Sequence, residues 1–244
     1  MIIPQLIGIC LFVFIPSIAN AQFDFLDGLK EKGMEQFGLS DSGGLSNDKI
    51  ISGLKEALEV GTENTVQLTG NTDGYLKNEA IKILLPEKLQ SMDKALRMVG
   101  LGPQIDEFVV SMNRAAEQAA PLAKPIFKEA LTEMSFEDGK KILSGGDTAA
   151  TDYFKEKTKG KLTEAFKPEV AEAMDQVGVA AQYKSLVGQY TSLPFVKAEQ
   201  FDLDNYVTGK SLDGLFYTLA QEEQKIRTNP AARVTDLLKE VFAK

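Results

Sequence analysis

The chain has 244 residues, a formal net charge of -8 and no histidine, and its single cysteine is Cys10. Without histidine or a cysteine pair, Ser-His-Asp triads, Cys-His nucleophiles and ordinary zinc or copper sites are excluded. A bound metal would have to accept oxygen ligands, and we predict neither a metal site nor a cofactor. The pI of about 4.8 and the absence of a basic run argue against nucleic-acid binding.

The first 21 residues have the pattern of a signal peptide. An apolar run at residues 6–15 precedes Pro16 and the small-x-small sequence Ala19-Asn20-Ala21, so we expect cleavage before Gln22. A membrane anchor is the alternative, since no Lys or Arg precedes the run, but a spanning helix needs roughly 20 apolar residues. We therefore expect a periplasmic or secreted protein with no transmembrane anchor in the mature chain.

Residues 22–45 combine a short apolar pattern with a Ser/Gly-rich loop, which predicts an N-terminal arm. The helical domain is expected to span residues 46–244, with Ser46 as the first N-cap. Its first helix is predicted from apolar or small residues at helical spacing: Ile50, Leu54, Ala57, Leu58, Gly61, Thr65 and Leu68.

Residues 70–74 should end that helix, and residues 81–85 precede Pro86. The residue before a proline avoids the α region, and no partner strand is evident, so we predict a tight connector there.

From Glu87 onward the pattern predicts helices, and the clearest apolar stripe comprises Ile105, Phe108, Val109, Met112, Ala116 and Ala119. Pro121 and Pro125 should interrupt or kink its continuation. Further breaks are expected at residues 100–103, 145–146, 168, 178 and 193–194. The expected fold is all-α, a single compact multi-helix domain with an orthogonal or bundle-like arrangement.

Several polar residues are predicted to begin helices. Asp147 is expected to cap a helix that runs through Ala165, while Asp202 and Asp204 suit a helix start. Asn229-Pro230 should open a final helix. Backbone N–H groups after Gly145-Gly146 could hold an anion, but Asp147 is the favoured occupant.

Five stretches of the chain resemble one known family. They are residues 49–58, 80–86, 112–117, 142–151 and 222–238, including Arg233, and the similarity covers nearly all of residues 46–242. The chain resembles the exported bacterial family catalogued as domain of unknown function 4197. This resemblance implies a helical, exported bacterial protein, and it supplies no catalytic residues.

Glu223 is the most informative single residue. On a helical wheel of residues 215–227 it falls within the apolar stripe, and Arg227 lies at its edge. A buried carboxylate requires a partner or takes up a proton. We favour an internal ion pair with Arg227 or with an arginine of another helix, and the alternative is a general acid or ligand-binding group in a cleft.

Asp106, Asn113 and Glu117 lie along one flank of the 105–119 stripe, with Arg114 further round. A polar rim is the favoured interpretation. If this flank faces Glu223, the two glutamates could converge for carboxylate catalysis such as glycoside cleavage.

We therefore expect a non-enzymatic binding or scaffold protein of the periplasm or cell envelope, with an unknown protein or small-molecule partner. One alternative is a hydrolase that uses Glu117 and Glu223, with Arg114, Arg227 and Arg233 as orienting or substrate-binding cations. Another is a carrier that holds an apolar ligand between its helices. Asn113 is a further ligand-binding or structural candidate.

Overall fold

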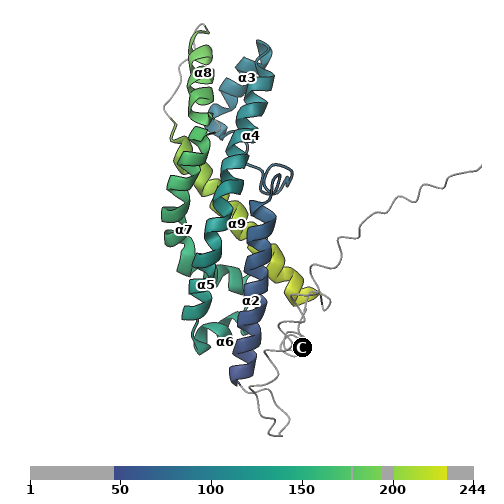
Figure 1. Ribbon diagram of the computed structural model, residues 1–244. Helices are drawn as coiled ribbons and strands as arrows, with labels where there is room; N and C mark the ends of the chain where they lie inside the picture. The colour runs from purple at the N-terminus through teal and green to yellow at the C-terminus, as the bar shows by residue number, and fades with distance from the viewer. Residues whose placement is uncertain (1–46, 177, 194–200, 230–244) are drawn as a thin grey trace, which may run out of the picture. The chain divides into compact units, whose positions relative to one another are not determined.

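The computed structural model describes residues 47–176, 178–193 and 201–229, all of which belong to the second of two parts of the chain, Met1–Gly44 and Leu45–Lys244. No strand occurs among these residues, and the all-α prediction is confirmed. The helices are α2 (Asn47–Gly70), η1 (Glu87–Leu89, a 3-10 helix), α3 (Gln90–Met98), α4 (Gly102–Ala119), η2 (Ala120–Leu122, a 3-10 helix), α5 (Ala123–Glu133), α6 (Phe136–Ser144), α7 (Ala149–Gln176), α8 (Val179–Thr191) and α9 (Leu203–Thr228) (Figure 1).

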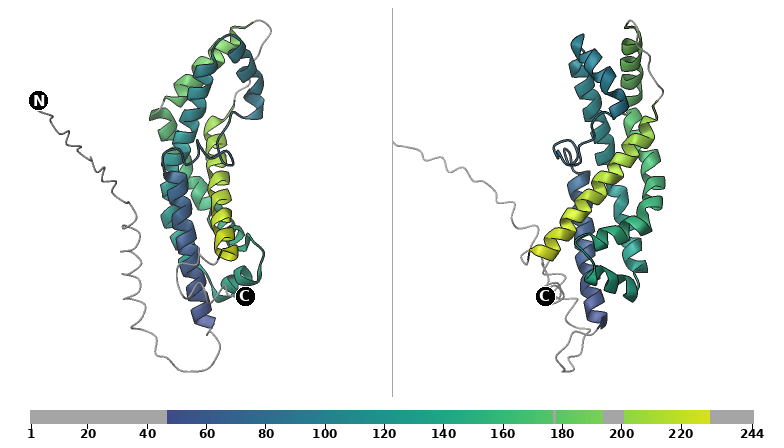
Figure 2. Two further views of the ribbon diagram at one scale, coloured as in Figure 1. Left: turned by 90° about the vertical axis from the view of Figure 1, so that its right-hand side faces the viewer. Right: turned by 180° about the vertical axis from the view of Figure 1, so that it is seen from behind.

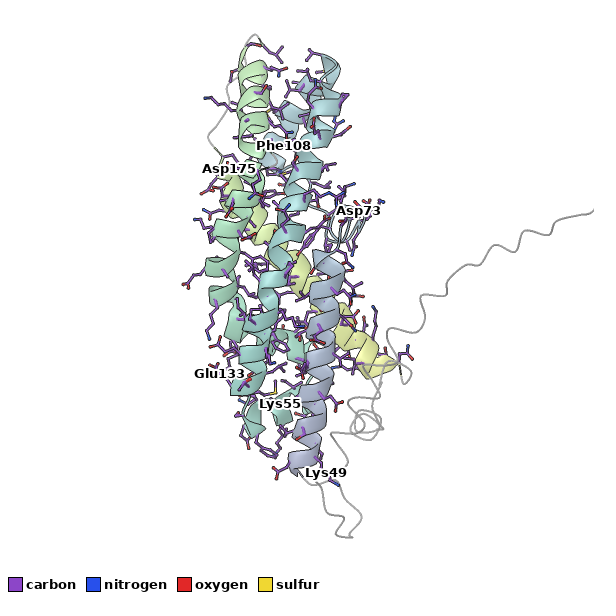
Figure 3. The ribbon with its side chains drawn as sticks, in the orientation of Figure 1. Lys49, Lys55, Asp73, Phe108, Glu133 and Asp175 are labelled. Atoms are coloured by element: carbon purple, nitrogen blue, oxygen red, sulfur yellow. The ribbon has the colours of Figure 1, made fainter. Side chains whose placement is uncertain are left out.

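Helix α4 lies at the centre of the core, where it packs against α2, α7, α8 and α9. Its predicted stripe is buried, apart from Val109, which is half-buried. Phe108 of this stripe, which is labelled in Figure 3, stacks on Tyr183 of α8, and the ring centroids are 6.0 Å apart. Burial of such apolar side chains, each worth roughly 1.5–3 kcal/mol, is what holds the helices together.

Helix α9 crosses the other long helices obliquely, as Figure 2 shows from behind, and it packs chiefly on α7 and α2. The close approach of Tyr75 to α9 depends on a glycine. A Cβ built on Gly214 would lie 2.5 Å from Cε1 of Tyr75, so no side chain fits there. The ring of Tyr75 thus reaches α9, and its hydroxyl donates a 2.6 Å hydrogen bond to the carbonyl oxygen of Ser211.

Residues 71–86 connect α2 to η1, and residues 82–86 of this connector have no regular secondary structure, as predicted. Tyr75 and Ile83 of the connector are nevertheless fully buried, with exposed fractions of 0% and 1%. Backbone that is buried without a helix or strand ladder must find other hydrogen-bond partners. This requirement determines much of the arrangement of the site described below.

The predicted interruptions at Pro121, which lies in η2, and at Gly100, Gly145-Gly146 and Gly178 are present. Pro125 lies in the first turn of α5 and does not interrupt that helix. Gly100 and Gly178 have positive φ angles of 86° and 74°, which glycine adopts readily. Asp202 caps α9 as predicted, because its side chain accepts a 3.0 Å hydrogen bond from the N–H of Asn205.

Two details of the helix predictions are wrong. The expected break at Pro168 is absent, since α7 continues through it to Gln176. Pro168 is exposed, while Phe166 and Val170 beside it are fully buried, so packing offsets the hydrogen bond that proline removes. Leu68 was predicted to lie on the apolar stripe of the first helix, but its side chain is 48% exposed. The neighbouring Thr69 occupies the buried side and donates a hydrogen bond to the carbonyl oxygen of Thr65.

Several predictions lie outside the described residues: the signal peptide 1–21, the arm 22–45, the Ser46 cap, and the final helix with Arg233. Pro194 also lies outside them. None of the helices in the described ranges combines the length and apolar character that a membrane crossing requires.

Two glycines of α9 provide a test of this packing. Gly214→Ala should lower the free energy of unfolding by about 1–3 kcal/mol, because the new methyl group meets Tyr75 at 2.5 Å and Cβ of Ile81 at 3.1 Å. Gly209→Ala is the matched control: nothing lies within 4 Å of its Cβ, so it should raise stability by about 0.5–1 kcal/mol. Urea unfolding measures both, and equal effects would contradict the close contact.

Candidate functional site

The buried carboxylate of Glu223 binds the start of another helix. Although it lies on α9, its Oε1 accepts a 2.9 Å hydrogen bond from the N–H of Ala150, and its Oε2 accepts 2.8 Å bonds from the N–H and hydroxyl of Thr151. Ala150 and Thr151 belong to the first turn of α7, whose N–H groups have no partner within the helix. Glu223 therefore acts as the N-terminal cap of α7.

Arg227 completes this arrangement. Its Nε and Nη2 atoms lie 2.9 and 2.8 Å from Oε1 of Glu223, so the predicted i,i+4 ion pair is present. Nη2 also donates a 2.9 Å bond to the carbonyl of Ile142 in the last turn of α6. The pair therefore joins the end of α6 and the start of α7 to α9.

The prediction that Asp147 caps α7 is wrong, since its side chain makes no capping hydrogen bond in the described part of the chain. Asp147 is exposed and precedes the first helical residue by two positions. An anion does bind the N–H groups there, but it is the carboxylate of Glu223. A partner 72 residues away could not be identified from the local pattern.

The surroundings of Glu223 leave little room for a substrate. Glu223 is 5% exposed, and the void beside it has a volume of about 10 Å³, which holds one water molecule at most. Apolar side chains such as Leu54 and Ile142 form much of its wall. The geometry suits a structural carboxylate.

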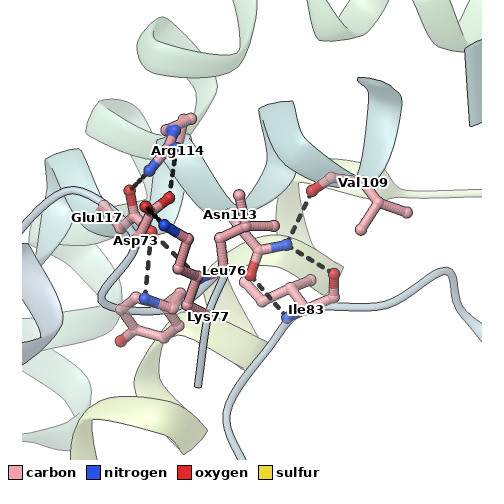
Figure 4. A network of polar contacts seen from close by, with 9 residues as sticks. Asp73, Leu76, Lys77, Ile83, Val109, Asn113, Arg114 and Glu117 are labelled. Carbon is pink, nitrogen blue, oxygen red and sulfur yellow. Dashed lines mark hydrogen bonds and ion pairs between the residues drawn. The ribbon is translucent and has the colours of Figure 1, made fainter. Parts of the chain in front are cut away.

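Glu117 of α4 binds the connector in a similar manner. Its Oε1 accepts hydrogen bonds from the N–H groups of Tyr75 and Leu76 at 3.1 and 3.2 Å. Its Oε2 pairs with Arg114 at 2.6 Å, and Arg114 reaches Asp73 of the connector at 2.6 Å (Figure 4). The carboxylate is 4% exposed, so these bonds replace its hydration.

The charges in this cluster support one another. Hydrogen bonds from Lys77 and then from Arg114 lower the pKa of Asp73, while bonds to Glu117 and Asp73 raise the pKa of Arg114. Both groups therefore stay ionised near neutral pH. Burial raises the pKa of Tyr75, which remains a hydrogen-bond donor.

Asn113 binds the next part of the connector through both ends of its side-chain amide. Its Oδ1 accepts from the N–H of Ile83, and its Nδ2 donates to the carbonyl of Ile83, each at 2.8 Å (Figure 4). Nδ2 also donates to the carbonyl of Val109. The amide thus makes the backbone hydrogen bonds that a neighbouring strand would make. Asn113 and Glu117 are both buried and bind backbone groups, so the prediction that this flank is a polar rim is wrong for these two residues. Asp106 is exposed and pairs with Arg97.

The structure does not bring Glu117 and Glu223 together. The two glutamates lie at different positions along α2. The backbone of Glu117 lies beside Gly70, whereas Glu223 lines a void together with Ala57. At 1.5 Å per residue, positions 57 and 70 are about 20 Å apart along the helix. Paired carboxylates of glycosidases are separated by roughly 5–9.5 Å, so these two cannot act on one bond. Nor do three Asp or Glu side chains gather as metal ligands within the described residues.

Another depression lies elsewhere, between the connector and α9. This groove has a volume of about 340 Å³. It is lined by Ala80, Ile81, Lys82, Leu84, Tyr206, Lys210, Asp213, Gly214 and Tyr217. Leu84 and Tyr217 are 58% and 45% exposed, and both lie on this groove.

Sequence reasoning missed three contributors: Tyr75, the lining of the groove, and Glu222. Glu222 is 6% exposed and binds Asn64 of α2 and Lys225. The helical pattern places Glu223 on the buried face of α9. The burial of the neighbouring Glu222 results from the packing of α2 on α9, which the local pattern does not show. Tyr75 follows a glycine in a stretch that the pattern treats as a loop.

Substitution of the α7 cap tests its structural role. Glu223→Gln should lower the free energy of unfolding by about 1–3 kcal/mol, because the neutral amide keeps only one acceptor oxygen for the donors of Ala150 and Thr151. Glu164→Gln, on an exposed position of α7, is the matched control and should change stability by less than about 0.5 kcal/mol. Urea unfolding at neutral pH measures both, and equal stabilities of the two variants would refute the capping role.

Comparison with known proteins places the chain in a family. No curated protein matches it, and no solved structure does. A family model described as "Protein of unknown function (DUF4197)" matches residues 44–243, which include the helices of the described ranges and the groove. The chain therefore belongs to this family of proteins of unknown function.

Proposed function

We propose that this protein is a non-enzymatic binding protein that acts in the periplasm or cell envelope, and that the groove between the connector and α9 holds its partner. The observation that carries this proposal is the groove itself. It combines exposed Leu84 and Tyr217 with a buried floor at Ile81 and Gly214. Tyrosine and large aliphatic side chains at a solvent-exposed depression are characteristic of binding surfaces.

The groove is also rigid, which favours binding. Its connector wall is fixed to α4 by Asn113 and Glu117, and the hydroxyl of Tyr206 donates a 2.8 Å bond to the carbonyl of Leu84. A surface that is already ordered loses little conformational entropy when a partner binds. The buried polar residues of α4 thus support a surface for recognition.

The hydrolase alternative lacks support, because Glu117 and Glu223 are far apart and each is occupied by backbone N–H groups. The apolar-carrier alternative is less well supported than the groove proposal, since the groove is open and bears the charges of Lys82, Lys210 and Asp213. Location outside the cytoplasm is supported by the signal-peptide pattern of residues 1–21.

A photo-crosslinker in the groove tests this proposal. Replacement of Tyr217 by p-benzoylphenylalanine, an aromatic residue of related shape, should give a discrete crosslinked product in intact cells, because Tyr217 lies on the groove rim. The product should appear in the periplasmic or envelope fraction on immunoblots.

The same photoreactive residue at Glu164, exposed on α7, serves as the control and should give no such product. Identical products from both positions, or none from Tyr217, would contradict binding in the groove. A product confined to the cytoplasmic fraction would contradict the proposed location.

A further inference from the structure

We infer that the groove recognises an extended acidic peptide segment that carries an apolar side chain. This inference rests on the proposed function and specifies the chemistry of the partner.

The charged side chains of the groove favour an acidic partner. Lys82 and Lys210 contribute two positive charges and Asp213 one negative charge, in a chain whose formal net charge is -8. The described carboxylate partners of the two lysines are Glu79 and Asp213, each 3.8 Å away and 86% and 72% exposed. Such exposed surface pairs contribute little to stability, so a carboxylate of a ligand can replace them at little cost.

Repulsion from the remainder of the acidic chain does not prevent this. At physiological ionic strength, charges separated by more than about 8 Å are largely screened. The charged side chains beside the groove, and not the distant ones, therefore determine the field that a bound carboxylate experiences. Charge complementarity of this kind determines which partners bind and how fast they associate.

The connector backbone favours an extended peptide. Lys82 and Leu84 line the groove, whereas Ile83 between them is buried, which is the alternation of an extended chain. Asn113 occupies the N–H and carbonyl of Ile83 on one side. In an extended chain the carbonyl of Lys82 and the N–H of Leu84 point to the opposite side.

These two backbone groups have no hydrogen-bond partner among the described residues. Their spacing around Ile83 matches a parallel strand pair, in which one residue of the partner donates to the carbonyl of Lys82 and accepts from the N–H of Leu84. The other groups on that side are occupied, since the N–H of Lys82 binds the carbonyl of Asn78, and the carbonyl of Leu84 binds Tyr206. We therefore expect backbone pairing with a single residue of the peptide.

The apolar surface provides the remaining contact. Ile81 at the floor and the rings of Tyr206 and Tyr217 surround the space, whose volume of about 340 Å³ is near the lower end for ligand sites. The open rim at Leu84 and Tyr217 suits a segment that enters and leaves the groove, as a peptide does. A small ligand would be more fully enclosed.

A phage-displayed library of random octapeptides, panned on the purified full chain, tests the inference. The enriched sequences should combine Asp or Glu with at least one apolar or aromatic residue. In fluorescence polarisation the best peptide should bind about tenfold or more weakly to the Lys82→Glu/Lys210→Glu variant, and more weakly at high salt.

The Lys155→Glu/Lys159→Glu variant changes the same charge at exposed positions of α7 and should bind as the unmodified protein does. N-methylation of the peptide, one amide at a time, should abolish binding at the one residue that donates to Lys82. Equal thermal melting of the two variants establishes that the groove variant is folded.

Several results would overturn the inference: no enrichment, enriched sequences without an acidic bias, equal binding to both double variants, or tolerance of every N-methylation. The proposed function is judged separately by the crosslink at Tyr217. A crosslinked partner together with failed acidic peptides would leave a binding groove of different chemistry, whereas the absence of a crosslink would remove the groove as the binding site.

Discussion

Buried backbone N–H and C=O groups that no helix or strand ladder pairs must find other hydrogen-bond partners. The connector at residues 71–86 and the first turn of α7 both face this requirement, and both meet it with side chains from distant helices. Glu117 and Asn113 of α4 bind the N–H groups of the connector, and Glu223 of α9 binds those of α7. Each unsatisfied buried group would cost about 1–3 kcal/mol, which is comparable to a large part of the stability of a domain.

This constraint changes how the buried carboxylates are interpreted. A buried glutamate in a helical stripe is a candidate for catalysis, since burial is one way to perturb a pKa. Here the carboxylates of Glu117 and Glu223 are surrounded by backbone donors and arginines, and the void beside Glu223 is about 10 Å³. Their effect on function is indirect: by holding the connector in place, Glu117 and Asn113 build the wall of the groove in which we propose that a partner binds.

The sequence predicts what periodicity and local chemistry determine. The stripe of α4, the glycine breaks, the Asp202 cap and the Glu223–Arg227 pair at i,i+4 all follow from residues close together in the chain. The errors have tertiary causes. Glu223 of α9, and not Asp147, caps α7. Helix α7 continues past Pro168 because the residues beside it are packed in the core. The roles of Asn113 and Glu117 depend on which segment covers α4. The groove could not be predicted, because it exists only where the connector meets α9.

Native-state hydrogen exchange, read at single amides, shows whether α4 fixes the connector. We predict that the N–H groups of Tyr75, Leu76 and Ile83, which lie outside helices, exchange as slowly as core amides of α4, because Glu117 and Asn113 hold them. The N–H of Leu84, an exposed residue of the same connector, has no hydrogen-bond partner among the described residues and provides the internal comparison. Exchange at Tyr75, Leu76 and Ile83 as fast as in an unfolded chain would contradict the claim that α4 fixes the connector and, with it, the wall of the groove.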